Sequence, residues 1–251
     1  MSRQDNTRLN LFCIYITVVW MYYKCIVWVL FLLILLIQQK VVGIETLSLS
    51  YAGNFKVQES LPPLKKESYP VIVYNHDPYH DWVSRDVSYL HKIFNEWGFA
   101  TIFPISKHRK LNALHGTLLY VRNSQELDIK NTYLIGIGSS GLLSLLVAPH
   151  FPKLKHIILI APHGIDTGGH LSLLNLKKII PKIKQPITVF FSKKDSLWRL
   201  REQKKIVVLL EQYNKTITII PYNVNHKWFR KNQARYINKL KTLMVEYAHE
   251  N

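Results

Sequence analysis

The chain has 251 residues, 48% of them hydrophobic, and a formal net charge of +17. This apolar content excludes an intrinsically disordered chain and is sufficient for one well-packed core. The positive charge suits nucleic acid or an anionic lipid surface, but no RNP, helix-turn-helix or zinc-finger pattern occurs, so we expect no nucleic acid partner.

The first predicted element is a membrane segment. Leu11–Ile37 are almost continuously apolar and contain one charge, Lys24. A helix needs about 20 apolar residues to span a bilayer, so this run is long enough. A cleaved signal peptide would use Cys25–Ile37 as its hydrophobic region, but no good small-x-small cleavage motif follows before residues 48–52. We therefore predict that residues 1–40 form an uncleaved, single-pass transmembrane anchor.

The basic residues around this segment indicate its orientation. Arg3, Arg8 and Lys24 belong to its amino-terminal side, and Lys40 and Lys56 follow it. Because basic flanks stay in the cytoplasm, this small excess predicts that the rest of the chain lies on the non-cytoplasmic side. After residue 40 the chain holds 29 of its 33 lysines and arginines and 15 of its 16 acidic residues, a net charge of +14. Together with the predicted anchor, this positive charge makes a membrane the expected partner.

Residues 41–68 are predicted to be a linker with a small β-hairpin, which ends at Pro62 and Pro63. From residue 69 to residue 251, short β-rich runs alternate with amphipathic stretches. The predicted strands are Val71–Tyr74, Ala100–Phe103, Tyr133–Ile137, His156–Ile160, Ile187–Phe191 and Ile217–Ile220. The predicted helices are Ser84–Trp97, Leu114–Arg122, Leu142–Ala148, Arg199–Tyr213 and Phe229–Ala248. This alternation favours an α/β domain whose mostly parallel sheet has helices on both faces.

Two chemistry-bearing residues follow predicted strands. Pro186–Leu197 (PITVFFSKKDSL) is a strand whose following turn presents Asp195, and Ile219–Phe229 (IIPYNVNHKWF) presents His226 in the same way. Parallel sheets place their sites at the carboxyl ends of the strands. A carboxylate that orients an imidazole makes that imidazole a general base. The pair therefore indicates the acid and base of a catalytic triad.

These segments resemble the α/β-hydrolase family, most of all its small dienelactone-hydrolase-like members. The similarity runs from about residue 69 to the end and rests on Pro70–Asp77 (PVIVYNHD), Tyr133–Gly141 (YLIGIGSSG), Ile157–Pro162 (IILIAP) and the two segments above. It implies an α/β-hydrolase fold and a nucleophilic serine in a G-x-S-x-G turn between a strand and a helix. Only 23 residues separate Pro162 from Pro186, too few for an elaborate lid.

The turn that should carry the serine departs from the family pattern. With Ser139 as nucleophile, Gly141 fits the pattern but Ile137 is too large. With Ser140, Gly138 fits but the following residue is leucine. The gapless match places Gly138 at the nucleophile position and leaves no nucleophile. We predict Ser139, and Ser140 or no nucleophile are the alternatives.

The oxyanion loop departs as well. The family usually has His-Gly-x there, whereas this chain has His76, Asp77, Pro78 and Tyr79. Proline has no N–H to donate, so Tyr79 would supply one backbone donor and Ser140 the other. Two histidines and two aspartates in residues 76–81 are metal-ligand types. Since no partner motif accompanies them, we expect a polar loop, no metal and no cofactor.

Together with the predicted anchor, the resemblance implies a membrane-anchored serine hydrolase that cleaves an ester, thioester or related acyl bond. Ser139 would attack, His226 would act as general base and then acid, and Asp195 would orient His226. The expected substrate is a small or lipid-like acyl compound. Lysines beside Asp195 are either a solvated charge run or a positive rim that favours an anionic or membrane-surface substrate. His163 and His170 are predicted to be solvated or rim residues. The alternative is a non-catalytic protein of the same fold that binds a partner or a membrane surface.

Overall fold

The computed structural model describes residues 24, 26–29, 44–50, 54–63, 66–76, 83–105, 110–164, 173–213, 216–225 and 237–244. The chain forms two compact units, Met1–Val42 and Gly43–Asn251. In the first unit only Lys24 and residues 26–29 are described, and they are helical and exposed. The predicted membrane segment thus lies almost entirely outside the described residues. Within the described residues, no helix has the length and apolar character needed to cross a membrane.

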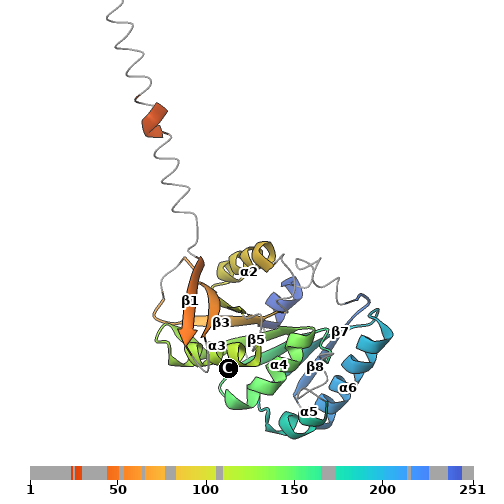
Figure 1. The fold of residues 1–251 in the computed structure, drawn as a ribbon. Helices are drawn as coiled ribbons and strands as arrows, with labels where there is room; N and C mark the ends of the chain where they lie inside the picture. Colours follow the sequence, from red (N-terminus) through yellow and green to blue (C-terminus); the bar gives the residue numbers. More distant parts are fainter. Residues whose placement is uncertain are drawn as a thin grey trace, which may run out of the picture. The chain divides into compact units, whose positions relative to one another are not determined.

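An eight-stranded sheet lies at the centre of the second unit (Figure 1). Its strands are β1 (Ile44–Ser50), β2 (Asn54–Ser60), β3 (Tyr69–Asn75), β4 (Ala100–Ile105), β5 (Leu127–Ile137), β6 (His156–Ile160), β7 (Ile187–Ser192) and β8 (Ile217–Tyr222). Their order is β1-β2-β4-β3-β5-β6-β7-β8. The strands from β4 to β8 in this order are all parallel, as the sequence predicts.

The first two strands form the hairpin predicted within residues 41–68. β1 pairs with β2 in antiparallel fashion, from Ile44 opposite Ser60 to Ser50 opposite Asn54. β2 in turn pairs antiparallel with β4, with Lys56 opposite Ile105. The hairpin therefore extends the same sheet that the later strands build.

Five labelled helices accompany the sheet: α2 (Val83–Glu96), α3 (Lys110–Asn123), α4 (Ser139–Val147), α5 (Leu173–Ile179) and α6 (Leu197–Tyr213). Residues 237–244 are also helical, within the predicted helix Phe229–Ala248. Two short 3-10 turns, Ala148–His150 and Ile180–Lys182, follow α4 and α5. Helix α5 is not among the predicted helices, because its seven residues lie in the short connection between Pro162 and Pro186.

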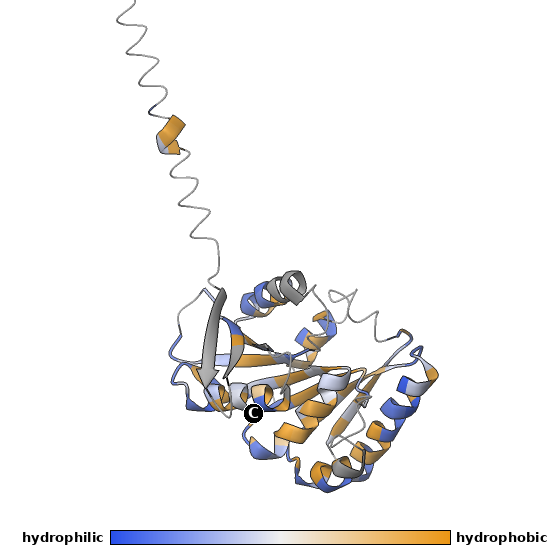
Figure 2. Cartoon of the chain, in the orientation of Figure 1, coloured by the Kyte–Doolittle hydropathy of each residue, from blue (hydrophilic) through white to orange (hydrophobic). Residues whose placement is uncertain are grey.

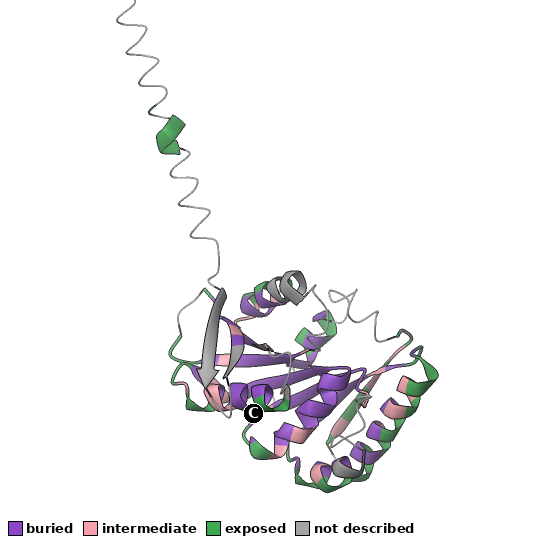
Figure 3. Cartoon of the chain, viewed as in Figure 1, coloured by how far each residue is buried: buried purple, intermediate pink, exposed green. Residues whose placement is uncertain are grey.

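The two faces of the sheet have different helical layers. In β3, Ile72 and Tyr74 pack with Leu90 and Phe94 of α2 and with residues 237–244. The alternate side chains of the strands pack against α3, α4, α5 and α6 on the other face. Figure 2 shows that the central strands and α4 are hydrophobic, and Figure 3 shows that they are buried while α6 keeps an exposed outer face. Strand alternation thus separates two apolar layers.

Two histidines are buried in these layers. The exposed fraction is 1% for His91 and 0% for His156. The His91 Nδ1 atom contacts the Thr101 hydroxyl, and His156 Nε2 lies 2.9 Å from the Thr188 hydroxyl. Burial disfavours the charged imidazole and lowers the pKa of each histidine to about 4.

Candidate active site

A sharp turn joins β5 to α4 at the carboxyl edge of the sheet. The strand ends at Ile137, the helix begins at Ser139, and Gly138 alone lies between them, with φ 59° and ψ −125°. L-residues with a side chain rarely adopt this positive φ, whereas glycine does so readily. The Gly138 amide donates to the Ile160 carbonyl at 2.9 Å, which fixes the turn to β6. Gly138 is therefore the tip of the turn.

Close packing on each side of the tip sets this register. A Cβ atom at Gly136 would lie 2.5 Å from Ser144 Oγ, 2.7 Å from Gly141 Cα and 2.8 Å from the Ser140 carbonyl oxygen. A Cβ atom at Gly141 would lie 3.1 Å from Pro162. Strand and helix can approach this closely only where both positions lack a side chain. The resulting register is that of the gapless alignment with the family turn, in which Gly138 takes the nucleophile position.

The two serines lie beyond the tip. Ser139 is the first residue of α4 and is 8% exposed, and Ser140 is 1% exposed. The Ser140 carbonyl accepts hydrogen bonds from Ser144 Oγ at 3.0 Å and from Asn75 Nδ2 at 3.2 Å. The expectation that Ser139 occupies the tip is therefore wrong, because packing at Gly136 puts the tip one residue earlier. The amide that follows the tip belongs to Ser139 rather than to Ser140.

The space above the tip holds His163. A Cβ atom built on Gly138 would lie 3.1 Å from His163 Nε2. The other ring nitrogen, Nδ1, lies 2.9 Å from the Gly164 carbonyl oxygen. Since a carbonyl oxygen only accepts, Nδ1 carries the hydrogen, and in the neutral ring Nε2 is the acceptor. The His163 ring also lies 5.7 Å from the Trp198 ring, centroid to centroid.

The sequence predicts His163 to be a solvated or rim residue, whereas the structure places it above the tip. His163 lies three residues after the end of β6, and β6 is the parallel neighbour of β5. The ends of neighbouring parallel strands lie side by side, so a polar residue just after β6 falls beside the β5–α4 turn. This adjacency is the signal that could have identified it.

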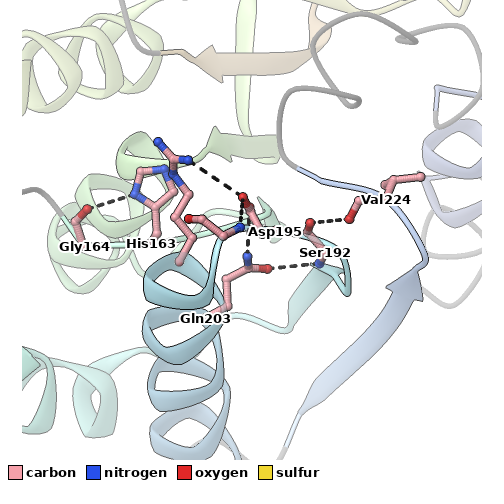
Figure 4. A network of polar contacts seen from close by, with 8 residues as sticks. His163, Gly164, Ser192, Asp195, Gln203 and Val224 are labelled. Carbon is pink, nitrogen blue, oxygen red and sulfur yellow. Dashed lines mark hydrogen bonds and ion pairs between the residues drawn. The ribbon is translucent and has the colours of Figure 1, made fainter.

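Asp195 lies, as predicted, in the turn after β7 and is buried. Its Oδ1 atom accepts from the Ser196 amide at 2.9 Å and lies 3.8 Å from an Arg199 guanidinium nitrogen. Its Oδ2 atom accepts from Gln203 Nε2 at 3.3 Å. Gln203 also accepts from the Ser192 amide at 3.0 Å. Figure 4 shows this network, which ties the turn to α6.

The second half of the predicted pair, His226, lies outside the described residues. The segment that leads to it is described as far as Asn225. Val224 lies beside the Asp195 turn, because its carbonyl accepts from Ser192 Oγ at 2.6 Å and from the Lys194 amide at 3.0 Å. The backbone two residues before His226 thus runs along the turn that carries Asp195.

The predicted oxyanion and polar loop is described only at its start. His76 is half-buried, and residues 77–82, with Tyr79, lie outside the described residues. No group of three or more histidine, cysteine, aspartate or glutamate residues arranged for a metal ion occurs in the part of the chain that is described. The site thus consists of the Gly138 tip, the His163 ring above it and the Asp195 network beside it.

Comparisons with known proteins agree on the fold. The profile of the dienelactone hydrolase family matches residues 98–250. Among curated proteins, none matches this sequence. A Klebsiella pneumoniae protein assigned to the dienelactone hydrolases is similar in structure, with a TM-score of 0.64, 15% identity, and coverage of 82% of this chain and 99% of its own.

A fungal esterase and the protein Est1E are similar to the same extent. One, from Rhizomucor miehei, has a TM-score of 0.68 and 14% identity and covers 84% of this chain and 87% of its own. The other, Est1E from Butyrivibrio proteoclasticus, has a TM-score of 0.65 and 14% identity, over 81% of this chain and 99% of its own. The domain therefore has the α/β-hydrolase fold that esterases use.

Proposed function

Because this chain belongs to the dienelactone hydrolase family but has glycine at the tip of its elbow, we propose that it is a membrane-anchored, non-catalytic member that binds an acyl-type ligand. Here the elbow is the β5–α4 turn. The observation that carries the proposal is the placement of Gly138. In this family the residue at that tip supplies the attacking oxygen or sulfur atom, and glycine has neither.

The surroundings of the tip support the same proposal. The His163 ring takes up the space into which a nucleophilic side chain would extend, 3.1 Å from the position of its Cβ atom. Ser139 and Ser140 begin a helix, and at least Ser140 is fully enclosed. A serine would need to be exposed at the tip, with a base within about 3 Å, to attack a substrate.

Asp195 has a structural role that is independent of catalysis. Its two carboxylate oxygens accept from Ser196 and Gln203 and face Arg199. Gln203 is fully buried and has the Ser192 amide as its second partner. Removal of the carboxylate would leave the buried Gln203 side-chain amide without this acceptor, which is costly. The presence of this acid therefore does not require an active triad.

The membrane part of the proposal rests on Leu11–Ile37, which holds a single charge in 27 residues. We propose that this segment spans the bilayer once and that the folded domain lies on the non-cytoplasmic side. The full chain should stay with membranes through alkaline carbonate washing. A mature amino terminus found between residues 49 and 53 would instead identify a cleaved signal peptide.

A second candidate function is the serine hydrolase with Ser139, His226 and Asp195, and with Tyr79 and Ser140 as oxyanion donors. Family membership favours it, as does the position of Ser139 directly after the tip. It requires the first turn of α4 to shift by one residue so that the Ser139 hydroxyl reaches the site.

Fluorophosphonate labelling of the full-length protein separates the two candidates. The non-catalytic protein should not be labelled but should still bind acyl-type ligands. Labelling that disappears in Ser139→Ala but persists in Ser140→Ala would establish the serine hydrolase instead. The two variants are well matched, because each removes one hydroxyl from neighbouring positions of the same helical turn.

A further inference from the structure

The turn between β7 and α6 exposes an unusual combination of side chains. Leu197 is 77% exposed and Trp198 is 42% exposed, at the start of α6. Lys193, Lys194 and Arg201 are exposed on either side of them. We name these five residues the docking rim. Two adjacent large apolar side chains surrounded by cations suit a partner surface that offers both apolar contact and negative charge.

The backbone holds this rim in place. The Lys193 amide donates to the Tyr222 carbonyl at 2.7 Å, and the Lys194 amide donates to the Val224 carbonyl at 3.0 Å. The Leu200 amide donates to the Ser196 carbonyl at 2.9 Å and starts the helix. The side chains of the two lysines therefore extend into solvent from a turn that is fixed to β8 and α6.

Within the described part of the chain, no exposed acid next to the rim is left to cancel its positive charge. The described acidic residues there are Asp195, buried within its own network, and Glu202, which pairs with Lys205 at 3.0 Å. Among the described residues, neither Lys193 nor Lys194 forms an ion pair. Because these cations keep their field in solvent, the rim attracts a negatively charged partner.

We propose that the docking rim binds the surface of an anionic lipid bilayer. Tryptophan and leucine insert at the headgroup level, where an indole is favourable, and lysines bind acidic headgroups. A protein partner would need a larger apolar patch than two side chains, and a nucleic acid would leave Leu197 without a covering surface. The proposal rests on the membrane anchoring proposed above, since the anchor keeps the domain near a bilayer. The further step is the chemistry of the lipid that the domain contacts, which is anionic.

The rim is continuous with the candidate site. Trp198 lies against His163, with 5.7 Å between ring centroids, and His163 lies above Gly138. Arg199 lies 6.0 Å from the centre of the Trp198 ring and also faces Asp195. A domain that docks through Leu197 and Trp198 therefore brings the Gly138–His163 site to the bilayer surface, where an acyl-type ligand would be available.

The test uses the full chain in lipid nanodiscs, with both cysteines replaced (Cys13→Ser, Cys25→Ser) and a spin label at Leu197→Cys. The measurement is the ratio of label accessibility to oxygen, which dissolves in lipid, and to a water-soluble nickel complex. Discs of phosphatidylcholine alone are compared with discs that also contain phosphatidylglycerol. A label at Val208→Cys is the matched control, since Val208 is 58% exposed and lies about three turns farther along the same helix.

The label at position 197 should become lipid-exposed only in the discs with phosphatidylglycerol, and the label at position 208 should stay aqueous in both. Lys193→Glu with Lys194→Glu should abolish the change, because each lysine contributes about five-fold to partitioning onto an anionic surface. The same charge reversal at Lys177 and Lys178, exposed residues of α5 before β7, should have little effect.

Aqueous labels in both kinds of disc would overturn the proposal, as would equal insertion without phosphatidylglycerol or equal loss from the two charge reversals. Failure of the anchor is recognised separately, because the protein would then elute without lipid. In that case docking is measured by flotation of the same labelled protein with phosphatidylglycerol vesicles. Neither result depends on fluorophosphonate labelling, which tests the candidate function of the elbow.

Discussion

His163 occupies the space that a side chain on Gly138 would need, with its Nε2 atom 3.1 Å from the position of the missing Cβ atom. The two residues come from different strand ends, and a backbone hydrogen bond from the His163 amide to the Gly138 carbonyl, 3.3 Å long, also joins them. Glycine at this tip and histidine above it are therefore mutually dependent. Either change, a larger residue at 138 or a smaller one at 163, would alter the site.

A serine introduced at the tip should be poorly tolerated. Gly138→Ser should lower the free energy of unfolding by about 1–3 kcal/mol, since a residue with a side chain is strained at this φ and meets the His163 ring. His163→Ala should restore part of this loss in the double variant. Urea unfolding of both single variants and the double variant measures the coupling. Additive effects would show that the two side chains do not compete for space.

Gly136 should be the most sensitive glycine of the elbow. Gly136→Ala should cost about 3 kcal/mol or more, because its Cβ atom would meet the backbone of α4 at 2.7 Å and the Ser144 hydroxyl at 2.5 Å. Gly98→Ala is the control: Gly98 has φ +85° but its Cβ atom would meet only Lys66 Nζ, at 3.6 Å. Its cost should be about 1–2 kcal/mol, from the backbone alone. Similar melting temperatures for the two variants would contradict the packing that places the tip at Gly138.

Asp195 should contribute to stability whether or not the protein is an enzyme. Asp195→Ala should lower the free energy of unfolding by about 1–3 kcal/mol, because the Gln203 amide and the Ser196 N–H lose their acceptor. Asp195→Asn retains one acceptor oxygen and should lose less. Thermal unfolding of both variants measures the difference. If Asp195→Ala were as stable as the wild type, the carboxylate would have no structural role and a catalytic one would be favoured.

The buried histidines should make the domain sensitive to acid. The pKa of His91 and His156 is about 4 in the folded state and about 6.5 in an unfolded chain. Between these values the unfolded state binds more protons, so stability falls as the pH decreases from about 6.5 to about 4. The slope is about 1.4 kcal/mol per pH unit for each histidine.

Urea unfolding at a series of pH values tests this prediction. His156→Asn removes one of the two titrating groups and should reduce the slope between about pH 6.5 and 4, even if it lowers stability at neutral pH. The matched control is the same change at His150, which is exposed at the end of the turn after α4. An unchanged slope in His156→Asn would mean that other groups cause the acid sensitivity.

The sequence by itself determined the layers of this protein. Apolar strands such as His156–Ile160 alternate with amphipathic helices, and this local pattern is sufficient to predict a parallel sheet with helices on both faces. It also determined that Asp195 follows β7, because the end of an apolar strand is visible in the residues themselves. The remaining part of the sheet, the edge hairpin, could be predicted as a hairpin but not as a member of this sheet. Pairing with β4 involves residues distant in the sequence.

Only the tertiary structure decided the chemistry of the elbow. Gly138, Ser139 and Ser140 are consecutive small residues; the gapless match to the family turn puts the tip at Gly138, but a shift of one residue would put it at Ser139, and the local pattern does not decide between them. The choice follows from the contact of Gly136 with Gly141 and Ser144 across the strand–helix junction, which no single segment contains. The position of His163 above the tip likewise requires that β5 and β6 be neighbours. Van der Waals exclusion between segments, rather than the propensity of any one of them, therefore places Gly138 at the position where the family has its nucleophile.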